Sequence, residues 1–536
     1  MKCALRIVCG ALLAALASGA PALTFTEPAA AAPALGAPTL AAPESLALAP
    51  AVAASAATVA LAPAVAAAEF TAPLASGQVM ATNELEYSYS TATQREIVED
   101  WLDVGWSLGE LRAGILFNHQ APAEEGTRAN MVRHRFVEFP THGLELRAGH
   151  FYGMFGRGLL FAAREDRRIR VDTALDGLLV SGRRGPLRGT MFTGTPSQRA
   201  VDVRGVDAEA QLGHGWALGG SGLTWRADDG VRADGSVRRE WVTAPRLTAT
   251  LPCGGLYAEY GWKRGWDFEA APDDAFQGGH AFYGSLQLFR GPLGLALEAK
   301  DYRRFAVLRG ADGRTPLNDP PSLTREHLYT LLNRAPQAVD ADGERGQQAE
   351  LTWECPGGWS ALFNASRTEQ PDGTPVFEEA YAQFDHQRLG AFSLRSGFGY
   401  RESEGLRQTV VAEVGWRLDS RRSLALEVEH QHVRLGGGVG FDLGAYDEEF
   451  LKLEFSVAPA WSAAAILEVN NKYVEQRVFG EQAGPFPAAQ LDYTTADGAR
   501  LALWAGRRQA GYLCAGGVCK YEPAFEGVEL TVTLRY

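Results

Sequence analysis

Apolar and polar side chains alternate one by one along the end of the chain. Val528, Leu530, Val532, Leu534 and Tyr536 fall on one face of an extended segment, and the residues between them are Glu, Thr, Thr and Arg. Because a β-strand points successive side chains to opposite faces, this pattern predicts a strand with one fully apolar face. Such a face must be covered, either by a second sheet in a soluble sandwich or by lipid around a transmembrane barrel.

The same alternation recurs along the chain after about residue 78. Clear examples lie at residues 85–89, 144–147, 293–298, 424–429 and 451–457. One such segment is weak evidence, but a long succession of them indicates an all-β protein. After the N-terminal region there is no window of about eighteen strongly apolar residues, so helical membrane spans are not expected.

The connections between the strands alternate between short and long. Short turns with Gly or Pro lie at 185–186, 214–215, 252–255, 291–292, 356–358 and 459–460. Longer polar segments lie between them, at 120–130, 196–204, 228–236, 265–278 and 436–447. A transmembrane barrel has short periplasmic turns and long extracellular loops, whereas a sandwich or propeller has no reason to keep this order. We therefore predict a large antiparallel up-and-down transmembrane β-barrel over residues 78–536, with an even number of roughly 22–24 strands.

Two segments precede the predicted barrel. Residues 1–22 have the form of a signal peptide, with Lys2 and Arg6 before an apolar core and small residues after it. Residues 23–77 are rich in Ala and Pro and contain hardly any charge, which predicts a disordered tether. An Ala-x-Ala site at Ala66 and Ala68 leaves a later cleavage point open.

Two long connections stand out, near residues 152–176 and 306–347. Loops of this length are usually functional or disordered. The first contains the candidates for a pore constriction: Arg157, Arg164, Glu165, Asp166, Arg167, Arg168, Arg170, Asp172 and Asp176. The second contains further charged candidates: Arg325, Glu326, His327 and Arg334. Within it, residues 322–333 are apolar enough to predict a short helix that begins near Ser322 or Thr324.

The charges of the first connection admit more than one interpretation. If the loop folds inward, opposed Arg and carboxylate groups would constrict the lumen and create a transverse field. The alternatives are a solvated extracellular loop, or charge pairs that merely hold the loop to the barrel wall. The apolar residues Leu159, Leu160 and Phe161 favour a loop that packs against the protein.

The cysteines and histidines give no metal-binding pattern. Cys514 and Cys519 flank a Gly-Gly turn and could form a disulfide in an oxidising compartment, or remain two free thiols. Cys253 and Cys355 belong to separate turns, and no cluster has the ligand spacing of a zinc site. No metal and no cofactor are therefore expected.

Three separated motifs carry a family resemblance. They are Phe-Gly-Arg-Gly-Leu at 155–159 with Glu-Asp-Arg at 165–167, Asn-Asp-Pro-Pro at 318–321 with Arg-Glu-His at 325–327, and Arg-Arg at 507–508 with the two cysteines that follow. Through them the chain from about residue 80 onward resembles an uncharacterised family of Gram-negative outer-membrane β-barrel proteins of porin-like type. The resemblance implies a location in the cell outer membrane, among its lipids, and implies no substrate.

The final strand carries a second resemblance. Its end, with Leu534 and Tyr536, is similar to the C-terminal signal that outer-membrane barrels present to the barrel-assembly machinery. The machinery and the outer-membrane lipid are therefore the expected partners. A nucleic-acid partner is not expected, because a net charge of −13 opposes phosphate binding.

We expect a porin-like channel or passive transporter for an unknown small solute, with a charged loop constricting the lumen. The alternative is a scaffold barrel that sheathes or anchors a partner. An outer-membrane enzyme is disfavoured, because the densest His and carboxylate group places Glu427 and Glu429 on one face of a strand and His430 and His432 on the other.

Overall fold

The structure is a computed structural model of the chain. It describes residues 77–123, 129–196, 201–231, 237–264, 278–307, 316–334, 336–403, 405–436, 444–473, 477, 484–515 and 518–536. All of these belong to one compact unit, Pro73–Tyr536. The predicted signal peptide, and the predicted tether up to residue 76, lie outside the described residues.

In the described part of the chain, 24 strands form one sheet. In chain order they are β1 (Gln78–Ser90), β2 (Arg95–Leu108), β3 (Leu111–Ala121), β4 (Asn130–Thr141), β5 (Leu144–Phe151), β10 (Leu175–Arg184), β11 (Leu187–Pro196), β12 (Val203–Gly213), β13 (Trp216–Val231), β14 (Val237–Leu251), β15 (Gly254–Arg264), β16 (Gly278–Arg290), β17 (Leu293–Arg303), β18 (Gly343–Cys355), β19 (Trp359–Glu369), β20 (Pro375–Leu389), β21 (Phe392–Glu402), β22 (Gly405–Arg417), β23 (Arg422–Leu435), β24 (Ala445–Val457), β25 (Trp461–Asn470), β26 (Phe486–Thr494), β27 (Arg500–Arg508) and β30 (Phe525–Arg535).

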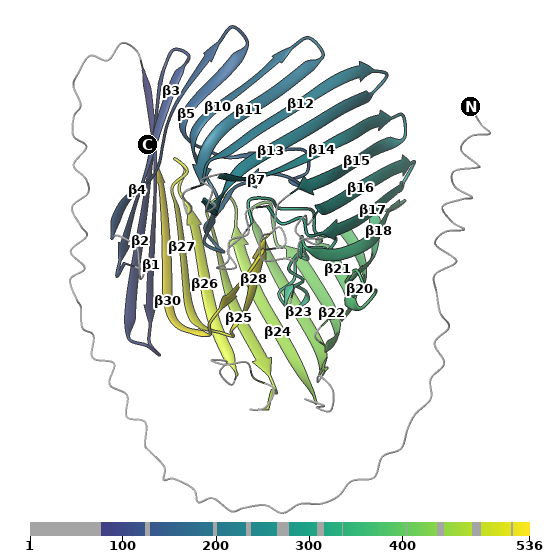
Figure 1. The fold of residues 1–536 in the computed structure, drawn as a ribbon. Coiled ribbons are helices and arrows are strands. Elements are labelled where there is room, and N and C mark those ends of the chain that lie inside the picture. The colour runs from purple at the N-terminus through teal and green to yellow at the C-terminus, as the bar shows by residue number, and fades with distance from the viewer. Residues whose placement is uncertain are drawn as a thin grey trace, which may run out of the picture. The chain divides into compact units, whose positions relative to one another are not determined.

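The sheet closes on itself. Each strand pairs antiparallel with the next, and β1 pairs with both β2 and β30, so that Tyr87 lies opposite Leu530 and Leu85 opposite Val532 (Figure 1). The backbone of Tyr536 exchanges two hydrogen bonds with Ala81, of 2.8 and 3.1 Å, at this seam. Closure leaves no unpaired edge. The predicted all-β, up-and-down barrel with an even strand number is confirmed.

The connections keep the predicted order. At one end of the barrel the strands are joined by turns such as 109–110, 142–143, 185–186 and 291–292. At the other end the strands are joined by longer connections, such as 152–174 and the one between β17 and β18. Some connections at this second end are also short, such as 91–94 and 370–374.

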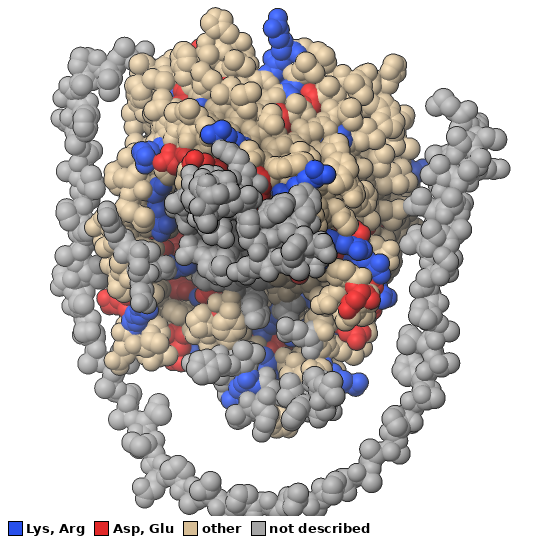
Figure 2. Space-filling model, viewed as in Figure 1, with Lys and Arg blue, Asp and Glu red and all other residues tan. Residues whose placement is uncertain are grey.

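The two faces of the wall differ in polarity. On β23, Val428 is 41% exposed on the outer face, whereas Glu429 faces the lumen and is fully buried. His430 and His432 also face outward, toward Glu449 (2.7 Å) and Asp447 (2.8 Å), so the imidazoles diverge from the inward glutamates, as predicted. In Figure 2 the charged atoms gather around the centre of the view, and the surface over β10 to β14 is mostly uncharged.

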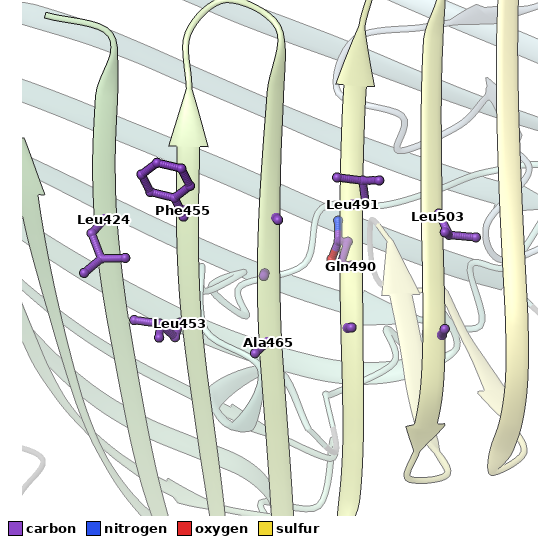
Figure 3. Close-up of a pocket in the computed structure, with 11 residues that line it drawn as sticks. Leu424, Leu453, Phe455, Ala465, Gln490, Leu491 and Leu503 are labelled. Carbon is purple, nitrogen blue, oxygen red and sulfur yellow. The ribbon is translucent and has the colours of Figure 1, made fainter. Parts of the chain in front are cut away.

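The outer wall has a shallow apolar depression of about 480 Å³ across β23 to β27 (Figure 3). Alanines such as Ala465 form its floor, and larger side chains such as Leu453 and Phe455 form its rim. Small residues next to large ones hollow the surface, because the strands themselves keep a fixed spacing. This depression belongs to the outer face and is separate from the lumen.

The two long connections differ in detail from their predicted form. We call residues 152–174 loop A; it contains the two-residue strands β6 (Gly153–Met154), β7 (Ala162–Ala163), β8 (Glu165–Asp166) and β9 (Val171–Asp172). We call residues 304–342 loop B; its described residues, 304–307, 316–334 and 336–342, contain one 3-10 turn, η1 (Leu331–Asn333). Asp176 therefore belongs to β10, and residues 343–347 belong to β18, not to the loops.

The predicted helix at 322–333 is wrong. Only η1 is helical there, because side chains take the place of intrahelical partners. Asn333 Oδ1 accepts a hydrogen bond of 2.9 Å from the His327 N–H, and Glu429 on β23 accepts bonds from Thr330 (2.9 Å) and Leu331 (2.8 Å). In the described residues, no helix is long and apolar enough to cross a membrane.

Candidate functional site

Loop A packs inside the barrel. Phe155, Leu159, Leu160 and Phe161 are almost fully buried, and the ring of Phe161 lies 4.6 Å from that of the lumen-facing Phe192 on β11. They share one apolar cluster with inward residues of β12, β13, β14, β16 and β17. In Figure 1 the strand β7 of this loop lies within the ring of strands. The expectation that the apolar part of the segment packs is thus met by aromatic contacts with the inner wall.

Arginines join loop A to the first two strands. Arg167 pairs with Glu84 of β1 at 3.2 Å and lies 4.5 Å above the Trp101 ring, and Arg170 pairs with Glu99 of β2 at 2.6 Å. On the far side, the Arg157 backbone N–H donates to Glu259 of β15 at 3.4 Å. Because β3, β4, β5 and β10 to β14 lie between β2 and β15 in the sheet, loop A spans a chord of the lumen.

The remaining acids of loop A pair within the loop or with β4. Asp166 accepts hydrogen bonds from the Arg168 and Ile169 N–H groups and pairs with the Arg168 guanidinium at 3.4 Å, and Glu165 pairs with Arg167 at 3.3 Å. Asp172 pairs with His134 of β4 at 3.0 Å. Burial by itself would raise the pKa of Asp172, but hydrogen bonds, first of all from His134, hold it below its usual range.

Asp176 does not join this group. It pairs with Arg135 of β4 at 3.1 Å from its place on β10. The other eight candidates of the first segment lie on loop A, and most of their charges pair with the wall or within the loop. The structure therefore agrees with two of the interpretations at once: the loop folds inward, and charge pairs hold it to the barrel wall.

Loops A and B are joined to each other. Asp319 donates its N–H to the Gly158 carbonyl at 3.0 Å, and Ala162 donates to Leu317 at 2.9 Å. The side chains of Arg164 and Asp319 form an ion pair. Gly158 has a φ of +83°, and a Cβ there would lie 2.6 Å from the Asp319 oxygen, so the contact requires glycine.

Loop B continues across the other half of the lumen. Arg325 pairs with Glu350 of β18, His327 with Glu379 of β20 at 3.1 Å, and Arg334 with both Glu448 of β24 (3.1 Å) and Glu468 of β25. Glu326, the fourth predicted residue of this loop, is exposed. The loop leaves the sheet between β17 and β18 and reaches β25, with β19 to β24 in between. Together the loops cross the lumen from β1 to β25.

The wall partners of the two loops were missed by sequence reasoning. They are inward-facing carboxylates spread over the sheet: Glu84, Glu99, Glu350, Glu379, Glu429, Glu448 and Glu468. Each occupies a polar position within an alternating strand, so the alternation itself was a usable signal for an inward glutamate. Nothing in the sequence indicates which loop residue each one meets.

In the part of the barrel that the structure describes, two cavities lie beside loop B. The larger, about 680 Å³, lies between the two loops and is lined by residues that include Arg157, Arg168 and Asp319; we call it the loop cavity. The smaller, about 320 Å³, lies between loop B and the wall, next to Glu427, Lys452 and other residues of β23 to β27. Both are inside the barrel, and both have charged linings.

The contact between the loops should depend on pH through Asp319. Burial raises the pKa of Asp319 to about 6, although Arg164 opposes this shift. Since the docked loops then bind a proton more tightly than separated loops, their contact should be strongest at low pH and weaken as pH rises through about 6. Hydrogen exchange of residues 158–164, corrected for intrinsic rates, should show this trend. Asp319→Asn should flatten it; an unchanged profile in that variant would contradict the assignment.

In the part of the chain that the structure describes, no group of three or more His, Cys, Asp or Glu side chains is arranged to hold a metal ion. The hairpin of β28 (Gly511–Ala515) and β29 (Val518–Glu522) places Cys514 opposite Cys519 in register. Their side chains lie outside the described residues, so the disulfide remains a prediction.

A closed antiparallel barrel of 24 strands, with an apolar outer face and a charged lumen, is a β-barrel of the outer-membrane type. The chain belongs to DUF6029, a family of unknown function, whose model matches residues 46–367 and 392–536. This confirms the resemblance to an uncharacterised barrel family. The match begins at residue 46, so it extends into the Ala/Pro-rich segment that the resemblance did not cover.

Several solved structures are similar to this chain. The translocation pore of the P pilus usher PapC has a TM-score of 0.48 and 9% identity, over 85% of this chain and 99% of that one. OccK10 (OpdN) of Pseudomonas aeruginosa has a TM-score of 0.32 and 11% identity, over 86% of this chain and 99% of that one. The ferric citrate transporter FecA has a TM-score of 0.37 and 9% identity, over 86% of this chain and 79% of that one. The search of curated proteins gave no match.

Proposed function

We propose that the chain is a porin-like channel or passive transporter for small solutes in the outer membrane of a Gram-negative bacterium, with a lumen constricted by loops A and B. The observation that carries this proposal is the double crossing of the lumen, with arginines on the loops and glutamates on the wall. A charged constriction selects solutes by size and by charge. The cavities on either side of loop B are the spaces left for a solute.

The outer-membrane location has its own support. The outward face of β30 continues that of β1 across the seam, with Leu530 opposite Tyr87 and Val532 opposite Leu85; Leu534 lies opposite Asn83. Tyr536 is 74% exposed at the end of β30 and hydrogen-bonds to Ala81, which leaves its ring accessible to an assembly factor. Lipid and the barrel-assembly machinery are the partners that this arrangement favours.

A scaffold barrel is the second candidate. A barrel that sheathes a partner needs a lumen wide enough to admit it, yet loops A and B fill much of this lumen with packed side chains. The apolar cluster of loop A, with Leu159, Leu160 and Phe161 fully buried, favours a permanent constriction over an entrance for a protein. A scaffold role would therefore require a partner that binds outside the lumen.

Planar-bilayer conductance tests the proposal. The purified chain should conduct in small steps, and replacing residues 308–338 by a short Gly-Ser linker should raise the conductance several-fold, because a barrel of this strand number encloses a wide lumen once unplugged. The control carries the same linker inserted in the turn 390–391, at the opposite end of the barrel. If neither the native nor the shortened barrel conducts, the scaffold candidate takes the place of the channel.

A further inference from the structure

Some charged side chains that line the loop cavity have ion-pair partners, and others are available to a ligand. Among the described residues the Arg157 guanidinium has no ion-pair partner, and it lies 5.3 Å from the centroid of the Tyr257 ring. The Arg168 side chain is 76% exposed and makes one long contact, 3.4 Å, with Asp166. Both arginines come from loop A and both line the cavity. They are therefore the cations available to a ligand.

The other charged groups of the cavity are already engaged. Arg325 pairs with Glu350, and Arg401 of β21 pairs with Glu379 at 2.6 Å. The carboxylates are engaged too: Asp319 with Arg164, Glu298 as acceptor of the Tyr283 hydroxyl at 2.8 Å, and Glu326 with a partner of its own. Glu298 keeps its negative charge, since its partner is a neutral hydroxyl, and Arg157 and Arg168 are the guanidinium groups left for a ligand.

The rest of the lining suits a ligand with an apolar body. Met154 of loop A is 61% exposed and lines the cavity together with Pro320 and Pro321 of loop B. A volume of about 680 Å³ lies within the usual range for small-molecule sites. Guanidinium groups bind carboxylates through paired, planar hydrogen bonds, which an ammonium cannot match.

We propose that the loop cavity binds small organic carboxylates with a short apolar body, held by Arg157 and Arg168. This inference rests on the proposed function, because the cavity lies where a solute crosses the lumen. The carboxylate meets the guanidinium groups of loop A, and the apolar body lies against Met154 and the proline rings. Cations are repelled by the same two arginines.

Calorimetric titration of the purified full chain in detergent tests the site without any need for conduction. The probes are pentanoate and pentylammonium, which share an apolar chain and differ in charge, with empty micelles as the blank. Pentanoate should bind at least tenfold more tightly than pentylammonium. Inorganic phosphate, which lacks the apolar body, should bind more weakly than pentanoate; tighter phosphate binding would overturn the role of Met154 and the prolines.

The double variant Arg157→Gln/Arg168→Gln should weaken pentanoate binding by about tenfold or more, as expected when a charged hydrogen-bond partner is lost. Arg422→Gln is the matched control, because that side chain is exposed and lies on the far end of β23. Equal binding of both probes, no binding of either, or equal affinity in the double variant would overturn the inference. A barrel that conducts but binds neither probe contradicts the site alone, whereas one that binds pentanoate without conducting contradicts the channel alone.

Discussion

Arg334→Ala should open the lumen more than any other single substitution in loop B. Arg334 is buried between Glu448 and Glu468, and although burial would lower its pKa, these two carboxylates raise it. Removing one partner of a buried ion pair costs about 3–5 kcal/mol, because the other charge is left uncompensated. Glu448 keeps Lys472 at 3.5 Å, but among the described residues Arg334 is the ion-pair partner of Glu468.

The expected result is a larger and noisier single-channel conductance, together with faster hydrogen exchange at residues 329–334. The double variant Arg334→Met/Glu468→Met should recover part of the native behaviour, since it removes the unpaired charge as well. Arg422→Ala, an exposed pair with Asp419, is the control and should change neither readout. A native-like Arg334→Ala barrel would show that other contacts hold loop B.

Phe161→Ala should release loop A. The Phe161 side chain has no exposed surface, and its ring lies 5.1 Å from Phe155 and 4.6 Å from Phe192. Loss of a buried phenylalanine costs about 3–5 kcal/mol. This free energy is lost from the docking of loop A and not from the barrel. The reason is that Phe161 takes no part in the hydrogen-bonded ladder around the sheet.

Limited proteolysis and gel migration separate these two effects. The variant should be cut within loop A at protease concentrations that leave the native chain intact, while the heat-dependent shift in migration of the folded barrel stays unchanged. Leu328→Ala is the matched control, because Leu328 on loop B is 76% exposed and contributes little packing. Equal resistance of both variants would mean that loop A does not depend on this aromatic cluster.

The barrel was predictable because its signals are local. Alternation has a period of two, so segments such as 424–429 and 451–457 reveal their inner and outer faces without knowledge of their neighbours. Turn chemistry at 185–186 and 291–292 fixes the short connections in the same way. The prediction failed at 322–333, where carboxylate and amide oxygens from Glu429 and Asn333 replace the partners that a helix would supply.

The candidate site was predictable only in part. The charged and apolar residues of loop A indicated an inward, packed segment, and loop B stood out by its length. The pairing of Arg167 with Glu84, or of Arg334 with Glu468, has no sequence signal, because residues so far apart in the chain meet only after the sheet has closed. The same holds for the loop cavity, which needs both loops in place.

Strand periodicity and turn residues act over a few positions, so the amino-acid order alone predicts a large antiparallel barrel with an apolar outside and a polar inside. The closure of β30 on β1 and the contact of the two long loops inside the barrel are seen only in the folded chain. The folded chain also shows which loop arginines form ion pairs with wall glutamates and which two remain exposed in the loop cavity. The reason is physical: long-range ion pairs and aromatic packing depend on the distances that the closed wall imposes.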